Sequence, residues 1–212
     1  MFQDRKEAGR KLGKALESYK KCDGLVLAIP RGGVEVGYYV ARHLRLPLSI
    51  IVVRKLPFPT NSEAGFGAIA EDGSTFFINR FANAVSPELV RGILQEQEQE
   101  LKRRIEVLRA GKPLPAITGK TVILVDDGIA MGSTMRAAVI LCRNKKAGRI
   151  VVAAPVASPT TYAELAELVD EIFILEKPPI FHAVAEAYEN WYDVPDDEVV
   201  NIMRMADAFE RA

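Results

Sequence analysis

The segment over residues 126–134 combines residue types that are able to bind a phosphorylated sugar. It follows the apolar residues 122–125 and consists of Asp126, Asp127, Gly128, Ile129, Ala130, Met131, Gly132, Ser133 and Thr134. Its small residues let the backbone come close to a ligand, and free N–H groups at the start of a following helix favour a phosphate. The paired carboxylates can accept hydrogen bonds from ribose hydroxyls or lie beside Mg²⁺. We therefore predict that this loop binds a sugar phosphate.

Better known phosphate-binding motifs do not describe this loop. No lysine follows Gly132, which excludes a Walker A loop, and Gly128 and Gly132 do not have the G-x-G-x-x-G spacing. Residues 65–70 fit G-x-G-x-x-A, but they follow a polar segment rather than a predicted strand, so a dinucleotide site is not expected there. Two acidic residues at the end of a strand could also form an ordinary turn. That alternative leaves the small residues and the hydroxyl pair unexplained.

A second candidate anion site precedes the first along the chain. Residues 30–33, which read Pro-Arg-Gly-Gly, follow the apolar residues 25–29. Arg31 offers a planar fork of donors, and the two glycines leave backbone N–H groups accessible, so a diphosphate could bind here. A plain turn between a strand and a helix would use glycine as well. Lys55 is a third candidate cation, although the pair Arg54-Lys55 could be ordinary surface charge.

Short apolar runs alternate with amphipathic segments along most of the chain. Continuous apolar runs predict strands, and apolar residues at helical spacing predict helices. The predicted strands are residues 25–29, 48–53, 121–125, 150–156 and 172–175. The predicted helices are residues 4–20, 34–45, 86–109, 134–146 and 159–168. This alternation favours parallel βαβ units. We therefore predict an α/β fold with a doubly wound, mainly parallel sheet. In such a fold, ligands bind beyond the carboxyl ends of the strands.

Two segments interrupt the alternation. Residues 56–74 are rich in proline and glycine and predict an irregular, flexible loop that could close over a site. In residues 177–212, prolines separate short apolar pieces, which predicts a small C-terminal hood, a cap over one edge of the sheet. We therefore divide the chain into a core over residues 1–176, which includes the flexible loop, and a cap over residues 177–212.

Composition and charge limit the classes of partner. The chain has 28 Lys and Arg against 28 Asp and Glu, so no overall positive charge favours nucleic acid or an anionic membrane. Cys22 and Cys142 lie far apart and lack metal-ligand spacing, which fits a reducing compartment. The longest apolar runs are far shorter than the ~20 residues that span a bilayer. With a charged N-terminus that does not resemble a secretory signal, we expect a cytoplasmic protein.

These segments together resemble the type I phosphoribosyltransferase family. The loop of that family that binds phosphoribosyl pyrophosphate (PRPP) is similar to residues 122–134, with the same order of strand, acidic pair, small residues and terminal hydroxyl. Its pyrophosphate loop resembles residues 30–33, and it often has a basic residue at the position of Lys55. With the flexible loop and the hood, the resemblance extends over nearly the whole chain. Met131 departs from it, since a threonine is frequent there and one hydroxyl donor is lost.

The resemblance implies an enzyme of nucleotide metabolism that transfers the 5-phosphoribosyl group of PRPP to a nitrogen nucleophile, usually of a nucleobase, and releases pyrophosphate. It implies Mg²⁺ as a cofactor, held mainly by PRPP and near Asp126 and Asp127, and a homodimer as the assembly. It assigns catalysis to Asp126, Asp127 and Lys55. It assigns substrate binding to Arg31, Gly32, Gly33, Lys55 and every residue from Asp126 to Thr134.

Two other functions are compatible with the same residues. A PRPP-binding regulatory protein would use the loop over residues 126–134 to sense its ligand without catalysis. A Mg²⁺-dependent phosphotransferase would use Asp126 as a nucleophile. The predicted cap has no base-recognition motif, so the sequence does not identify the acceptor.

Overall fold

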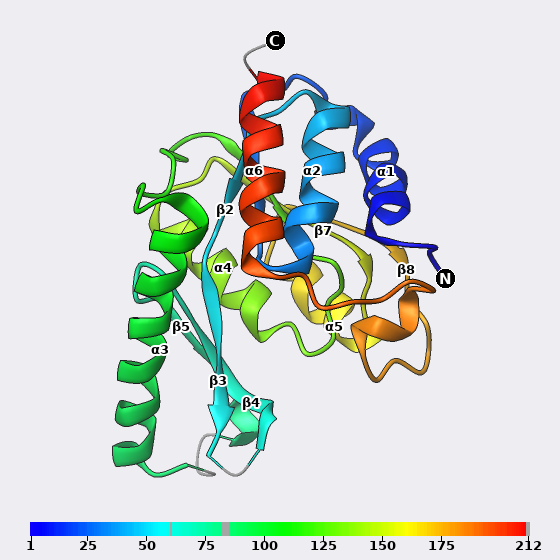
Figure 1. Ribbon diagram of the computed structural model, residues 1–212. Coiled ribbons are helices and arrows are strands. Elements are labelled where there is room, and N and C mark those ends of the chain that lie inside the picture. Colours follow the sequence, from blue (N-terminus) through cyan, green and yellow to red (C-terminus); the bar gives the residue numbers. More distant parts are fainter. Residues whose placement is uncertain (60, 82–84, 211–212) are drawn as a thin grey trace.

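A five-stranded parallel sheet forms the centre of the molecule (Figure 1). The computed structural model describes residues 1–59, 61–81 and 85–210. In spatial order the strands are β2 (Leu48–Ile50), β1 (Gly24–Ala28), β6 (Thr121–Val125), β7 (Arg149–Val156) and β8 (Glu171–Glu176). All four pairings are parallel, which confirms the predicted α/β fold with a mainly parallel sheet. Because the chain adds β2 on one side of β1 and β6 to β8 on the other, the strand order reverses between β1 and β6.

Helices cover both faces of this sheet. The helices α1 (Arg5–Ala15), α2 (Gly32–Leu44) and α6 (Asp196–Glu210) lie on the near face in Figure 1, and α4 (Ser133–Asn144) and α5 (Pro159–Ala166) lie on the far face. Alternate residues of β1 pack into the hydrophobic clusters on the two faces of the sheet, since successive side chains of a strand point to opposite faces. Val26 belongs to the buried cluster that includes Leu12 of α1, while Leu27 belongs to the cluster that includes Met135 of α4. The apolar runs read as strands are therefore buried on both sides.

A second, antiparallel sheet occupies the place where the sequence predicted a loop. Its strands are β3 (Val53–Phe58), β4 (Asn61–Ala70) and β5 (Thr75–Phe77), in the order β3-β4-β5. The prediction of one strand over residues 48–53 followed by an irregular segment over residues 56–74 is therefore wrong in its local structure. Strand β2 ends at Ile50, and the chain then enters the new sheet.

The glycines and prolines that suggested a loop serve strand pairing instead. A Cβ atom at Gly67 would lie 2.3 Å from the carbonyl oxygen of Phe76 on the neighbouring strand, so only glycine permits this close approach. Around Pro57 the register with β4 shifts, as at a β-bulge. Frequent glycine and proline usually indicate a loop. In this segment they belong to an irregular, tightly paired hairpin.

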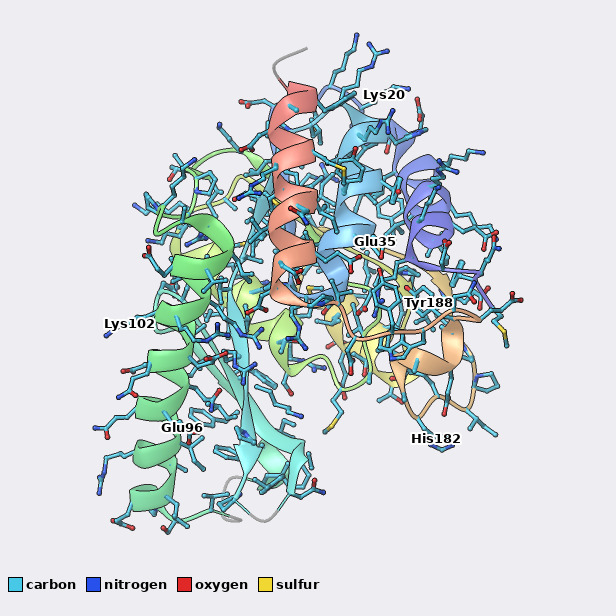
Figure 2. All side chains as sticks on the ribbon, in the orientation of Figure 1. Lys20, Glu35, Glu96, Lys102, His182 and Tyr188 are labelled. Atoms are coloured by element: carbon cyan, nitrogen blue, oxygen red, sulfur yellow. The ribbon has the colours of Figure 1, made fainter. Side chains whose placement is uncertain are left out.

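The long helix α3 (Pro87–Arg109) packs against this small sheet, and the two form an arm at the lower left of Figure 1. Its bounds confirm the predicted helix over residues 86–109. Leu101 and Leu108 are buried, while Glu96 and Lys102 are exposed. Lys102 points away from the arm in Figure 2. The oxygen of Ser86 accepts a hydrogen bond from the N–H group of Leu89 and caps the start of the helix.

Residues 177–210 divide between two places in the fold. A short 3-10 helix, Val184–Ala187, and the residues around it pack on the N-terminus, where the rings of Phe2 and Tyr188 lie 5.9 Å apart. Helix α6 was not predicted, although the sequence contains two signals for it. An acidic first turn follows Pro195, and the apolar residues Val199, Ile202 and Ala206 have helical spacing. These three side chains join the main core cluster. The division into a core and a cap stays a prediction.

Within the described part of the chain, no helix combines the length and the apolar character that crossing a membrane requires.

Candidate active site

Two of the predicted loops emerge side by side at the switch point of the main sheet. The last residues of the two central strands, Ala28 and Val125, are paired in register. The N–H group of Ile29 continues the pairing by donating to the carbonyl oxygen of Val125 at 2.8 Å. Because both strands end at the same level, the segments over residues 30–33 and 126–134 leave the sheet as neighbours. The peptide bond between Pro30 and Arg31 in the first of these loops is cis.

Gly32 and Gly33 let the first loop pack directly on the two carboxylate residues. A Cβ atom at Gly32 would lie 1.8 Å from Oδ2 of Asp127. A Cβ atom at Gly33 would lie 2.9 Å from the Cα atom of Asp126. Neither distance is sterically possible without a shift, so the contact between the loops requires glycine at both positions. The structure thus joins two motifs that lie far apart in the sequence.

Substitution of Gly32 by alanine is expected to lower the free energy of unfolding by about 1–3 kcal/mol, because the added methyl group overpacks the contact with Asp127. Gly92→Ala is the matched control, since a Cβ atom there has no neighbour within 4 Å among the described residues. The control should raise stability by up to about 1 kcal/mol, because alanine favours a helix more than glycine does. Urea denaturation measures both changes. Equal stability of the two variants would contradict the contact.

An arginine that the sequence analysis missed binds Asp127. The Nε–H group of Arg5 donates to Oδ2 of Asp127 at 2.8 Å, and the two side chains are only 3% and 13% exposed. The guanidinium also donates to the carbonyl oxygen of Tyr192 and lies 4.1 Å from the ring centroid of Trp191. The Tyr188 hydroxyl donates to the backbone carbonyl oxygen of Asp127 at 2.6 Å, and Tyr188 is labelled in Figure 2. The N-terminal helix and the segment around Tyr188 therefore help to build the site.

One feature of the sequence could have pointed to Arg5. It is the first residue of α1, where the positive end of the helix disfavours a cation. A basic residue at this position therefore suggests a carboxylate partner elsewhere in the fold. The sequence does not identify that partner, because Asp127 is 122 residues away.

The two carboxyl groups differ in their electrostatic surroundings. Burial and the neighbouring charge of Asp127 raise the pKa of Asp126 well above its usual value. Burial also raises the pKa of Asp127, but the ion pair with Arg5 opposes this shift. Oδ1 of Asp126 accepts a hydrogen bond from the N–H group of Asp127 at 2.9 Å. Asp126 is therefore the carboxyl group whose ionised form would gain most from a bound cation or from ligand hydroxyls.

The loop after the carboxylates is rigidly attached to its surroundings. Three of its backbone groups form hydrogen bonds with neighbouring segments. These bonds fix the conformation of the loop without a ligand. These bonds join Ile129 N–H to the Val156 carbonyl oxygen (2.9 Å), the Thr161 hydroxyl to the Ala130 carbonyl oxygen (2.6 Å), and Arg136 Nη1 to the Met131 carbonyl oxygen (2.7 Å). Neither Thr161 nor Arg136 was predicted from the sequence. Both hold the loop through its backbone.

The end of this loop has the geometry of a phosphate site. Gly132 adopts a left-handed conformation with φ of +72° and directly precedes α4. Within the described residues, no side chain caps the first N–H groups of α4. These groups, the positive end of the helix and the hydroxyls of Ser133 and Thr134 can together bind a phosphate. The side chain of Met131 is 43% exposed, at the rim of the loop.

The two candidate cations, Arg31 and Lys55, lie on different elements of the fold. Arg31 lies on the first loop, with Nη1 3.7 Å from Oδ1 of Asp196 at the start of α6. Lys55 lies on β3 of the smaller sheet. Its neighbour Arg54 faces α3 and donates to Gln97 at 3.0 Å, so strand alternation places Lys55 on the opposite face, toward α4. A direct role of Lys55 beside the two loops stays a prediction.

The residues of the site do not form a complete protein cage for a metal ion. Among the described residues, no group of three or more His, Cys, Asp or Glu side chains could hold one. Mg²⁺ prefers an octahedron of oxygen ligands, and one oxygen of Asp127 is already bound to Arg5. The donor set therefore fits a Mg²⁺ ion only if the ligand or water supplies most of the oxygen atoms.

Comparison with known proteins places these residues in a family context. The model of the phosphoribosyl transferase domain matches residues 3–190. Proteins of two Mycobacterium tuberculosis strains, H37Rv and CDC 1551, carry names that begin "Putative phosphoribosyl transferase" and are 37% identical over 216 aligned positions. The alignment covers 97% of this chain and 47% of each relative, so the chain spans about half the length of the curated relatives it matches. The crystal structure of TT1426 from Thermus thermophilus superimposes with a TM-score of 0.79 at 35% identity, covering 95% of this chain and 97% of that one.

Proposed function

Because this chain belongs to the phosphoribosyl transferase domain family, we propose that it transfers the 5-phosphoribosyl group of PRPP to a nitrogen nucleophile, usually of a nucleobase. The contact of Gly32 and Gly33 with the acidic pair at the switch point carries this proposal. A diphosphate loop and a ribose phosphate loop that touch one another would hold the two ends of one PRPP molecule. The identity of the acceptor is part of the proposal and not of the family assignment.

The donor would lie across the two loops. The 5-phosphate would bind the N–H groups at the start of α4 and the hydroxyls of Ser133 and Thr134. The diphosphate would bind the backbone N–H groups of Gly32 and Gly33 and the guanidinium of Arg31, which is accessible at 39% exposure. The ribose would then lie over the acidic pair between them.

Asp126 is the better candidate for contact with the ribose hydroxyls. Asp127 shares one carboxylate oxygen with Arg5, and its backbone carbonyl oxygen accepts from Tyr188. Asp127 would therefore act mainly by holding the loop, while Asp126 would accept hydrogen bonds from the ligand. This division of roles refines the assignment of both residues to catalysis.

The transfer requires stabilisation of charge on both sides of the bond that breaks. The bond from C1 of the ribose to pyrophosphate breaks, a bond from the acceptor nitrogen to C1 forms, and the nitrogen releases its proton. Positive charge develops on the ribose beside Asp126, and negative charge develops on pyrophosphate beside Arg31 and Lys55. Mg²⁺ bound to the diphosphate oxygens would neutralise part of the negative charge of the leaving group.

The segment over residues 56–74 would exclude water during transfer. Since its described residues form β3 and β4 and pack against α3, this shield would be a preformed arm rather than a loop that orders on binding. The contact of α3 and α6 through Arg103 and Asp196, at 3.3 Å, would couple the arm to the loop that bears Arg31. The proposed homodimer stays a prediction.

An acceptor screen tests the proposed activity. The full chain is incubated with PRPP, Mg²⁺ and each purine and pyrimidine base in turn, and released pyrophosphate and nucleotide are measured. Stoichiometric formation of both products with at least one base is expected. PRPP binding without turnover for every base would instead support the regulatory alternative. A phosphorylated Asp126 would support the phosphotransferase alternative.

A further inference from the structure

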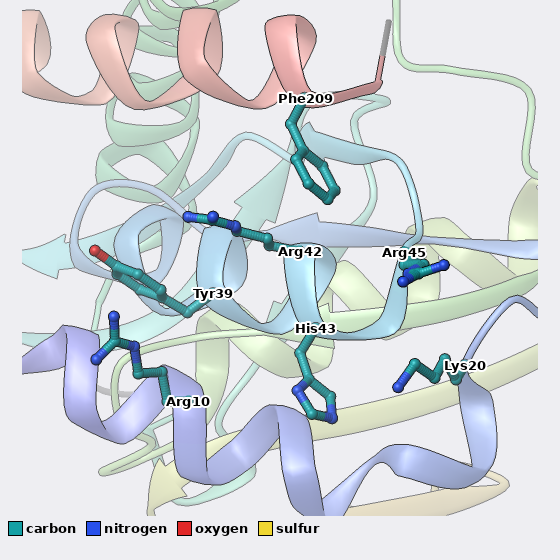
Figure 3. Close-up of a pocket in the computed structure, with 7 residues that line it drawn as sticks. All are labelled: Arg10, Lys20, Tyr39, Arg42, His43, Arg45 and Phe209. Carbon is teal, nitrogen blue, oxygen red and sulfur yellow. The ribbon is translucent and has the colours of Figure 1, made fainter. Parts of the chain in front are cut away.

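A basic cavity of about 420 Å³ lies at the far end of α2 from the candidate active site. Figure 3 shows its side chains around the last turns of α2, with α1 on one side and α6 on the other. It is lined by Arg10, Lys20, Tyr39, Arg42, His43, Arg45 and Phe209. Helix α2 begins at Gly32 and ends at Leu44, so the cavity and the diphosphate loop are separated by roughly 20 Å of helix.

The positive charge of this cavity is only partly compensated. Glu17 forms ion pairs with Lys20, at 2.7 Å, and with His43. In the described part of the chain, Arg10, Arg42 and Arg45 form no ion pair with a carboxylate. A cavity lined by charges of one sign attracts small ions of the opposite sign.

The negative end of α2 explains part of the cluster but not all of it. Arg42 and Arg45 lie at the C-terminus of α2, where cations interact favourably with the helix dipole. Arg10 belongs to α1, and Lys20 follows a separate short 3-10 helix, Glu17–Tyr19. The ion pair with Glu17 explains the position of Lys20, whereas Arg10 has no carboxylate partner among the described residues. The exposed side chain of Arg10 at this cavity is therefore available to an anion.

Two aromatic rings accompany the cations. The guanidinium of Arg10 lies 5.5 Å from the ring centroid of Tyr39, and that of Arg42 lies 5.6 Å from the ring centroid of Phe209. Phe209 is 41% exposed, so its ring is available at the rim of the cavity. Guanidinium groups bind phosphate through paired hydrogen bonds, and aromatic rings stack on planar bases.

We propose that this cavity binds a nucleotide that carries two or more phosphates, with the phosphates on the arginines and the base against the rings of Tyr39 and Phe209. Its volume lies in the range of about 300–1,000 Å³ that small-molecule sites occupy. A balanced net charge favours a small ligand over a nucleic-acid chain, which needs an extended basic face. The proposal does not depend on the proposed transfer activity, because none of the residues of the cavity belongs to the candidate active site.

Binding of ATP to the full chain tests this proposal. Isothermal titration calorimetry is carried out with saturating PRPP present, so that ATP cannot occupy the donor site. The double variant Arg10→Ala/Arg42→Ala should bind ATP at least tenfold more weakly, because each charge-assisted hydrogen bond contributes strongly. The control Arg91→Ala/Lys102→Ala removes the same charge from exposed positions of α3 and should change the affinity less than twofold. Circular dichroism confirms that both variants fold.

Several results would overturn the proposal. Absence of ATP binding, or binding that the double variant leaves unchanged, would show that the cavity is not a nucleotide site. Tripolyphosphate that binds as tightly as ATP would remove the role of the aromatic rings. A single-stranded RNA that binds more tightly than ATP and is lost in the same double variant would assign the cavity to nucleic acid instead.

Discussion

Asp126→Asn is expected to lower phosphoribosyl transfer by at least about a hundredfold while leaving the protein as stable as the parent or more stable. The loss of activity follows from the position of Asp126 beside the ribose of the proposed donor. The gain in stability follows from its raised pKa, because burial and the charge of Asp127 make its ionised form a cost to the folded state. Asparagine keeps the shape and removes that charge. Pyrophosphate release and urea denaturation measure the two effects.

The pH dependence of this effect has a definite sign. A carboxyl group whose pKa is raised in the folded state makes the protein less stable as the pH rises above 3.8, the ordinary pKa of an aspartate, because the unfolded chain releases the proton first. The parent should therefore lose more stability than Asp126→Asn between pH 4 and neutral pH. A variant that is fully active, or one that is less stable than the parent at pH 7, would contradict the assigned surroundings of Asp126.

Arg5→Met is expected to lower the free energy of unfolding by about 3–5 kcal/mol, because it leaves the carboxylate of Asp127 buried without its cation. The side chains are 3% and 13% exposed, so water cannot replace the guanidinium without opening the site. Methionine retains much of the contact with Trp191, which limits the change in packing. Denaturation by urea at pH 7 measures the effect.

A double-mutant cycle separates this ion pair from other consequences of the substitution. The variant Arg5→Met/Asp127→Asn removes both charges and should be more stable than Arg5→Met alone. Arg5→Lys is the conservative comparison. It should retain only part of the stability, because lysine keeps the positive charge but lacks the planar fork of N–H donors of the guanidinium. Additive effects of the two single substitutions would mean that the ion pair does not hold the acidic loop.

Asp126 and Asp127 show what local sequence patterns can and cannot predict. The acidic pair was recognisable because an apolar strand, two carboxylates and small residues are covalent neighbours. Their different surroundings were not recognisable, because they depend on which distant side chain is buried against each carboxyl group. From the sequence, Asp126 and Asp127 were assigned the same roles. In the folded protein they differ, because Arg5 forms an ion pair with Asp127.

The errors in the predicted elements have the same origin. Proline and glycine in residues 56–74 indicated a loop, yet they permit close strand pairing in the sheet β3-β4-β5. Helix α6 was missed because the prolines that separate short apolar pieces in residues 177–212 indicated a cap rather than a helix. Its apolar face becomes recognisable once the surface beside α2 that it covers is known.

The sequence alone determined the alternation of strands and helices around the main sheet, the candidate phosphate loop before α4 and the candidate diphosphate loop over residues 30–33. Each of these is a local property, set by the order of neighbouring residues and by backbone preferences within one turn or strand. Only the tertiary structure decided that β1 lies beside β6, that Gly32 touches Asp127, and that Arg5 binds the same carboxylate. Those contacts join residues about a hundred positions apart, and they exist because the sheet order and burial of apolar faces bring the segments together.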